Sequence, residues 1–110
     1  NVRRVAEVGK LMVDAGLVVI VALVSPFKVD RDHARELFGD GEFVEVWVKT
    51  PAEVCAERDP KGLYKKAKSG SLPNLTGVGQ DYEPPTDAEL VLDGTEEISI
   101  NVEKLIKEIL

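Results

Sequence analysis

The chain has 110 residues and a formal net charge of −6 at pH 7, and 44% of its residues are hydrophobic. This length allows one domain with a modest core, and the apolar content is too high for a disordered chain. The acidic balance argues against general nucleic-acid binding, which needs a broad basic surface.

The single cysteine and the single histidine limit the sites that the chain can build. Cys55 has no partner for an intrachain disulfide, which fits a reducing, cytoplasmic compartment. Cys55 and His33 together supply too few ligands for zinc, so we interpret them as a small core residue and a surface residue. No apolar run approaches the roughly 20 residues that cross a bilayer, so no membrane association is predicted.

The first part of the chain is predicted to form a helix, a strand and a second helix. Apolar residues recur every three to four positions over Val2–Ala15, which indicates an amphipathic helix that Gly16 closes. The continuous, β-branched run Leu17–Val24 predicts a strand buried on both faces, as in parallel sheets. Asp30 is placed to cap a short helix that ends at Gly39.

A second strand and a third helix follow. Phe43–Val48 predicts the strand, with its aromatic residues packed on the sheet. Thr50 and Glu53 have the spacing of a capping box, and Pro51 fits the first helical position, so a helix is predicted from there to Arg58.

The rest of the chain is predicted to contain a helix, a long loop, a strand and a terminal helix. A short helix is expected over residues 63–69, followed by a Gly- and Pro-marked loop over residues 70–88. Glu89–Leu92 predicts a third strand, and four apolar residues line the last helix, namely Val102, Leu105, Ile106 and Ile109. Alternating strands and helices predict a single α/β domain over residues 1–110, with helices flanking a parallel sheet. Three strands are few for this architecture, which suggests that the first strand or two are missing.

Ligands of open parallel sheets bind beyond the carboxyl ends of the strands. Three segments qualify here: Ser25-Pro26-Phe27, Lys49-Thr50 and Asp93-Gly94-Thr95. Ser25 offers a hydroxyl and a backbone N–H, and Phe27 offers a flat surface. The alternative is that Ser25-Pro26 is only the turn that ends a strand.

Positive charge gathers in Arg58–Gly70, which holds five of the 14 basic residues of the chain. Lys61 stands between Pro60, which fixes the local path, and Gly62, which permits close approach by a ligand. Arg58 and Lys61 at such a turn suit phosphate or sulfate groups. The alternative is a solvated helix face, and we favour that interpretation for the lysines at positions 65, 66 and 68. The sequence contains no phosphate-binding G-x-x-x-x-G-K-[ST] motif.

Four stretches of the sequence resemble the adenylylsulfate kinase (APS kinase) family. They are NVRRVAEVGKLMVDAGL, SPFKVDRDHAREL, FVEVWVKTPAEVCAERDPKGLYKKAKSG and LTGVGQDYEPP. The resemblance implies a P-loop kinase fold, a three-layer α/β structure, and phosphorylation of the 3′-hydroxyl of adenosine 5′-phosphosulfate (APS) by ATP and Mg²⁺. It also implies that this chain is the C-terminal two-thirds of such a domain. The P-loop and the Mg²⁺ ligands would then lie in a missing N-terminal segment, and residues 1–110 would be inactive alone.

The same resemblance implies roles for individual residues. The implied APS-binding residues are Asn1, Val24, Ser25, Phe27, Lys61, Asn74 and Leu75, with Ser25 and Lys61 as catalytic residues. Arg58, Asp59 and Thr95 are implied to lie near ATP, and residues 59–86 are implied to form a mobile lid. The family assigns Ser25 as a phosphoserine intermediate, whereas direct in-line transfer with Ser25 as a substrate contact is the more economical role. Leu75 stands where the family usually has an aromatic residue that stacks on adenine.

The resemblance also implies a homodimer and fusion to, or association with, ATP sulfurylase. Two alternatives to the kinase remain open. The first is a non-catalytic nucleotide-binding module that regulates a sulfurylase, which the absence of the P-loop favours. The second is a kinase of another small acceptor, for which Leu75 would mark an altered pocket.

Overall fold

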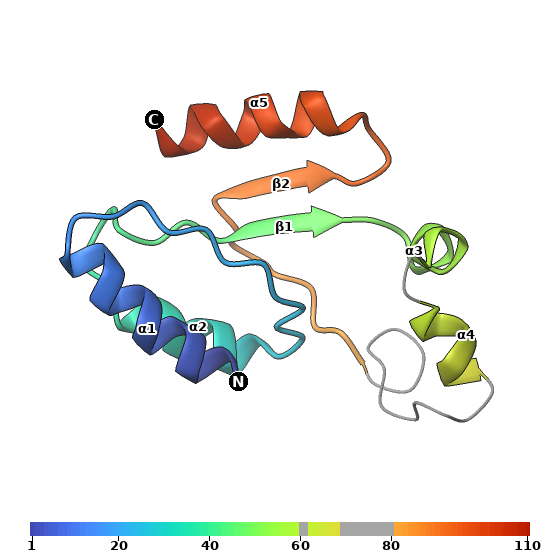
Figure 1. Cartoon of the computed structure of the whole chain (residues 1–110), viewed down its shortest axis with the longest axis horizontal. Helices are drawn as coiled ribbons and strands as arrows, with labels where there is room; N and C mark the ends of the chain where they lie inside the picture. Colours follow the sequence, from blue (N-terminus) through green and yellow to red (C-terminus); the bar gives the residue numbers. More distant parts are fainter. Residues whose placement is uncertain (60–61, 69–80) are drawn as a thin grey trace. The chain divides into compact units, whose positions relative to one another are not determined.

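The structure, a computed structural model, describes residues 1–59, 62–68 and 81–110 (Figure 1). Contacts divide the chain into two compact units, one of residues 1–43 with 82–84, and one of residues 44–81 with 85–110. Helices and a parallel sheet together are the elements of an α/β protein, as predicted, while the single domain and the lid over residues 59–86 stay predictions. Among the described residues, no helix has the length and hydrophobicity needed to cross a bilayer.

The first unit is built on two packed helices, α1 (Val2–Asp14) and α2 (Lys28–Glu36). Helix α1 confirms the predicted amphipathic helix within a residue, and Gly16 follows it with a φ of +92°, a conformation that favours glycine. In α2, Arg31 and Ala34 are each 7% exposed, so their shared face is the buried one.

Helix α2 begins earlier than the sequence indicates, and Asp30 is not its cap. Phe27 is the N-cap residue, and Asp30 lies in the first turn. The backbone N–H of Lys28 instead donates to Oε1 of Glu83 at 2.7 Å. A carboxylate distant in sequence therefore satisfies a donor at the helix start, and its negative charge also suits that end of the helix dipole.

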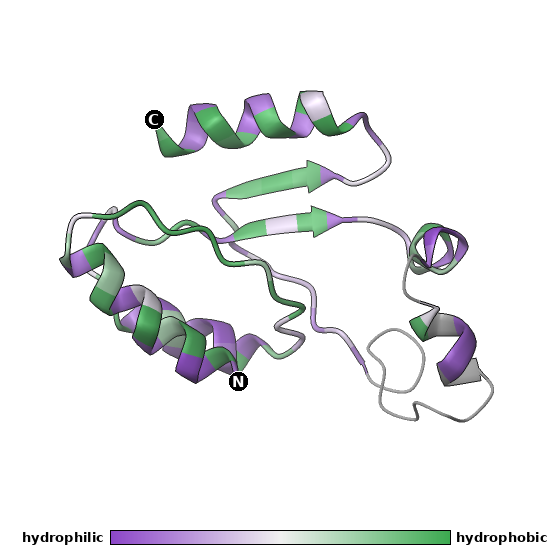
Figure 2. Ribbon diagram, viewed as in Figure 1, coloured by the Kyte–Doolittle hydropathy of each residue, from purple (hydrophilic) through white to green (hydrophobic). Residues whose placement is uncertain are grey.

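The predicted strand over Leu17–Val24 is wrong: the structure has neither helix nor strand there. Figure 2 shows this connection between α1 and α2 as a continuous hydrophobic stretch, and Val18 and Ile20 are 72% and 70% exposed. A strand exists only through the hydrogen-bond ladder to a neighbour. Within the part of the chain that the structure describes, only β1 and β2 form such a ladder, so apolar composition alone did not make this segment a strand.

Two aromatic residues, Phe38 and Phe43, pack together after helix α2. The rings of Phe38 and Phe43 pack with centroids 5.5 Å apart, and the guanidinium of Arg35 lies 4.8 Å from the Phe43 centroid. Phe43 lies before β1, which starts three residues later, and its packing on the sheet stays a prediction.

The second unit holds the sheet, formed by β1 (Val46–Lys49) and β2 (Leu90–Asp93). The two strands are parallel, as predicted, and pair from Val46 with Leu90 to Lys49 with Asp93. Leu92 is 6% exposed and is the buried hydrophobic residue of this sheet, and helix α5 (Ile98–Ile109) packs on β2. Both strands confirm their predictions to within a few residues.

Two short helices, α3 (Ala52–Arg58) and α4 (Leu63–Lys68), follow β1. Both were predicted, but the capping box is wrong: Pro51 is the N-cap residue of α3, and no side chain donates or accepts a cap hydrogen bond there. Thr50 instead lies against the backbone of Gly94, where its Oγ1 occupies the space that a Cβ would need. The Thr50 hydroxyl therefore packs between the two strand ends and does not cap α3.

Candidate functional site

The first candidate site is the loop after Val24, where Arg31 holds Ser25. Nη1 of Arg31 donates to the backbone oxygen of Ser25 at 2.6 Å, and Nη2 donates to the backbone oxygen of Glu83 at 2.6 Å. Ser25 has a φ of +39°, in the left-handed region that residues with a side chain seldom adopt. The guanidinium thus joins two backbone segments that are far apart in sequence.

Two further hydrogen bonds join the same segments. The backbone N–H of Glu83 donates to the oxygen of Pro26 at 2.8 Å, and the Glu83 carboxylate accepts from Lys28 as described above. The Arg31 guanidinium also lies 5.7 Å from the centroid of the Tyr82 ring. Residues Ser25–Lys28 are therefore held against Tyr82–Glu83 by backbone pairing and by one buried cation.

Sequence reasoning missed Arg31, Tyr82 and Glu83 as parts of this site. The signal available for Arg31 was its spacing: it stands four residues after Phe27, on the same face of α2 as Ala34. Nothing in sequence spacing joins Glu83 to a helix more than 50 positions earlier, because that pairing is tertiary.

The second candidate site lies at the carboxyl ends of β1 and β2. The backbone N–H of Gly94 donates to the oxygen of Lys49 at 3.0 Å, so the parallel ladder continues one step beyond the strands. Thr50 and Gly94 touch directly. These two strand ends therefore meet, and a glycine is required where they meet because a side chain has no space.

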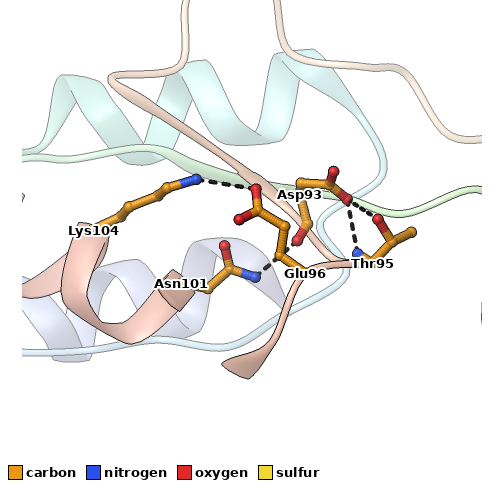
Figure 3. Close-up of polar contacts among 5 residues, drawn as sticks. All are labelled: Asp93, Thr95, Glu96, Asn101 and Lys104. Atoms are coloured by element: carbon orange, nitrogen blue, oxygen red, sulfur yellow. Dashed lines mark hydrogen bonds and ion pairs between the residues drawn. The ribbon is translucent and has the colours of Figure 1, made fainter. Parts of the chain in front are cut away.

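Asp93 organises the loop after β2 (Figure 3). Its Oδ1 accepts from the Thr95 backbone N–H at 2.8 Å and from the Thr95 hydroxyl at 2.5 Å. The Asn101 side chain donates to the backbone oxygen of Asp93 at 2.8 Å, and Lys104 pairs with Glu96 at 3.1 Å. Because the Thr95 hydroxyl donates to Asp93, its oxygen lone pairs are left to accept.

The hydrogen bonds from Thr95 lower the pKa of Asp93 below its ordinary value of 3.8. The side-chain bond is the largest cause and the backbone bond the second. A lowered folded-state pKa contributes stability that is present above the unfolded-state pKa. This contribution is lost as the pH falls below about 3.8 and through the lowered folded-state value.

Replacing Thr95 by valine should raise the pKa of Asp93 part of the way back to 3.8. Valine removes the hydroxyl donor and keeps the backbone N–H, so the larger of the two causes disappears and the smaller one remains. An NMR titration of the Asp93 carboxyl carbon in both proteins measures the shift. Thr86→Val is the matched control elsewhere on the surface, and an unchanged Asp93 pKa in Thr95→Val would contradict the assignment.

Helix α3 ends with two residues predicted to lie near ATP: Arg58 is its last residue, and Asp59 is its C-cap residue. Asp59 has a φ of +21°, and its carboxylate accepts from the backbone N–H of Lys65 at 3.2 Å. The N–H of Gly62, whose φ is +66°, donates to the Asp59 oxygen at 3.0 Å. The Asp59 carboxylate therefore holds the start of α4.

The other predicted site residues divide into two groups. Asn1 is the exposed N-cap residue of α1, Val24 is exposed, and Phe27 is the half-buried N-cap residue of α2. Lys61, Asn74 and Leu75 lie outside the described residues. The structure brings Ser25 and Phe27 together in one loop of the first unit, and it places Arg58, Asp59 and Thr95 in the second unit.

Within residues 1–59, 62–68 and 81–110, no three or more His, Cys, Asp or Glu side chains cluster in a way that could hold a metal ion. No role in binding Mg²⁺ is assigned to a described residue.

Comparison with known proteins identifies the family. A sequence profile described as adenylylsulphate kinase matches residues 1–93. The probable adenylyl-sulfate kinase of Halalkalibacterium halodurans is 51% identical over 107 residues, which cover 96% of this chain and 52% of that protein. The bifunctional enzyme NodQ of Rhizobium tropici is 60% identical over 92 residues, which cover 84% of this chain and 15% of that protein.

A solved structure agrees with the sequence matches. It is that of the Mycobacterium tuberculosis APS kinase CysC in complex with AMPPNP and APS, which is 35% identical to this chain. The likeness has a TM-score of 0.92 and covers 97% of this chain and 63% of that one, so the fold is the α/β fold of P-loop kinases. The chain spans about half the length of the curated relatives it matches. With the family profile matched over residues 1–93 and the structural likeness along nearly all of its length, this chain belongs to the adenylylsulphate kinase family.

Proposed function

We propose that the protein containing this chain is an adenylyl-sulfate kinase that transfers the γ-phosphoryl group of ATP to the 3′-hydroxyl of APS. The products are ADP and 3′-phosphoadenosine 5′-phosphosulfate, and the hydroxyl proton leaves as the new O–P bond forms. The observation that carries this proposal is the likeness, over 97% of the chain, to a kinase solved with AMPPNP and APS together.

The proposed roles of the first unit concern APS. Asn1, Val24 and Phe27 contact the substrate, and Ser25 presents its hydroxyl and backbone N–H to it. The fixed backbone of the Ser25 loop supports this role, because phosphoryl transfer depends on positioning and electrostatic stabilisation. Asn74 and Leu75 are proposed to complete the acceptor pocket, with Leu75 covering the adenine by apolar contact.

The proposed roles of the second unit concern ATP and charge. Arg58, Asp59 and Thr95 border the ATP base, and Lys61 reaches the anionic groups of the substrate. The Asp93–Thr95 hydrogen bonds support the role of Thr95, since they fix its backbone and leave its oxygen able to accept a hydrogen bond.

The remaining proposals concern the whole protein. Mg²⁺ would act with ATP by neutralising phosphate charge, and its ligands would belong to a part of the protein outside the described residues. A cytoplasmic location and a homodimer are further proposals. Fusion to, or association with, ATP sulfurylase is a proposal too, supported by a bifunctional relative in which the matching region is 15% of the protein.

The decisive experiment is a coupled ADP-release assay on the full-length protein, with and without APS. We expect ADP release that depends on APS and one 3′-phosphorylated product per ADP. Adenosine 5′-phosphate, which lacks the sulfate, and other small hydroxyl acceptors serve as control substrates. Release with another acceptor and none with APS would favour the second kinase alternative, and nucleotide binding without turnover would favour the non-catalytic module.

The Ser25→Ala variant separates the two roles of that serine. Alanine keeps the Cβ and removes only the hydroxyl, so a substrate contact should cost about 1–2 kcal/mol, or roughly five- to thirtyfold in kcat/KM for APS. A covalent phosphoserine route would instead lose activity by a thousandfold or more, because the nucleophile is gone. Steady-state kinetics, with intact-mass measurement of the wild-type protein after incubation with ATP, distinguish the two outcomes.

A further inference from the structure

Arg31 is buried, and its guanidinium donates hydrogen bonds to two backbone oxygens. It is 7% exposed and is the one charged side chain that is buried among the residues the structure describes. Its two terminal nitrogens donate to the backbone oxygens of Ser25 and Glu83. A buried cation is costly to desolvate, so its retention here calls for a role that an apolar side chain could not fill.

The geometry of this pair requires a guanidinium. Both contacts are 2.6 Å long and come from the two terminal nitrogens of one planar group. A lysine ammonium is a point charge on a flexible stem and does not present this rigid fork. The fork therefore holds two backbone segments at one separation, and the face of Tyr82 adds a cation–π contact at 5.7 Å.

The segment that Arg31 holds is the one in which Ser25 has its left-handed φ of +39°. With its carbonyl held by Arg31, Ser25 cannot relax to an extended backbone without losing that hydrogen bond. The direction of the Ser25 hydroxyl and the path of Pro26 into α2 both depend on this conformation.

We propose that Arg31 is a positioning residue for APS: by bridging Ser25 and Glu83, it holds the Ser25 loop in the conformation that receives the substrate. This inference rests on the proposed function. The consequence is that acceptor binding depends on a side chain that need not itself touch the acceptor, and that Glu83 takes part through its backbone oxygen and its bond to Lys28.

The test compares Arg31→Lys with wild type in the full-length protein. Lysine keeps the charge and most of the volume, so folding is maintained while the fork is lost. We expect the KM for APS to rise at least fivefold and the KM for ATP to stay within twofold. Arg35→Lys is the matched control on the same helix, since the Arg35 guanidinium lies over Phe43, and it should leave both values within twofold.

Hydrogen exchange of single amides provides a readout that does not depend on turnover. The N–H groups of Lys28 and Glu83 report the bonds between the two segments, and those of Leu90 and Gly94, which donate to Glu45 and Lys49, report the sheet. In Arg31→Lys we expect at least tenfold faster exchange at the first pair and unchanged exchange at the second.

The inference requires both changes. A uniform loss of kcat with an unchanged KM for APS, or unchanged exchange at Lys28 and Glu83, would overturn it and leave Arg31 a stabilising residue only. If the wild-type protein does not phosphorylate APS, the ADP-release assay contradicts the proposed function. The exchange result then decides alone whether Arg31 holds the loop.

Discussion

Replacing Gly94 by alanine is expected to lower the free energy of unfolding by about 1–3 kcal/mol, the usual cost of overpacking. The new Cβ would lie 1.6 Å from Oγ1 of Thr50 and 2.9 Å from its Cβ. Rotation of Thr50 about χ1 could move the first atom away but not the second. The strand ends must therefore separate, which also strains the Gly94–Lys49 hydrogen bond. Thermal and denaturant unfolding of the full-length protein measure the loss.

Two controls make this prediction specific. Gly9→Ala lies within α1, where the new Cβ meets nothing within 4 Å, and should stabilise the protein by about 0.5–1 kcal/mol. Adding Thr50→Ala to Gly94→Ala removes the closer of the two clashing atoms, so it should recover part of the loss, which a double-mutant cycle reports. Equal stability of Gly94→Ala and wild type would mean that the strand ends are not in contact.

Local sequence patterns predicted the first helix and the two strands that pair with each other. The helical periodicity of Val2–Ala15 and the apolar runs before Lys49 and Asp93 each correspond to an observed element. Leu17–Val24 has the strongest strand composition of the chain and is not a strand. A helix contains its own hydrogen bonds, whereas a strand needs a neighbour, and composition carries no information about that neighbour.

The candidate sites divide in the same way. Thr95 could be located from the sequence as the end of a strand that exists, whereas Ser25 was singled out as the end of a strand that the structure does not contain. The side chains and backbone groups that hold these residues in place could not be located from the sequence. Arg31 and Glu83 act on Ser25 across the fold, and Thr50 turned from its helix toward Gly94. The side chains of Arg31 and Thr50 each contact a backbone group far away in the sequence, at Glu83 and at Gly94. Local sequence patterns carry no information about such contacts.

Replacing Lys61 by methionine is expected to reduce kcat/KM for APS by about 10- to 150-fold. We propose that this ammonium meets an anionic group of the substrate, and a hydrogen bond to a charged group contributes about 1.5–3 kcal/mol. Lys61 lies outside the described residues, and its neighbours support the proposal. The nearest described residues, Asp59 and Gly62, have φ values of +21° and +66°.

The matched control for Lys61→Met is Lys65→Met, which makes the same change of charge and shape on the exposed face of α4. The Lys65 backbone N–H that donates to Asp59 is kept, so the control should stay within threefold of wild type. The loss in Lys61→Met should also shrink as salt is raised, because screening weakens the attraction that wild type retains. Equal losses in the two variants would show that the basic segment acts only through its summed charge. No loss in either would make it a solvated helix face, as its lysine-rich composition alone suggests.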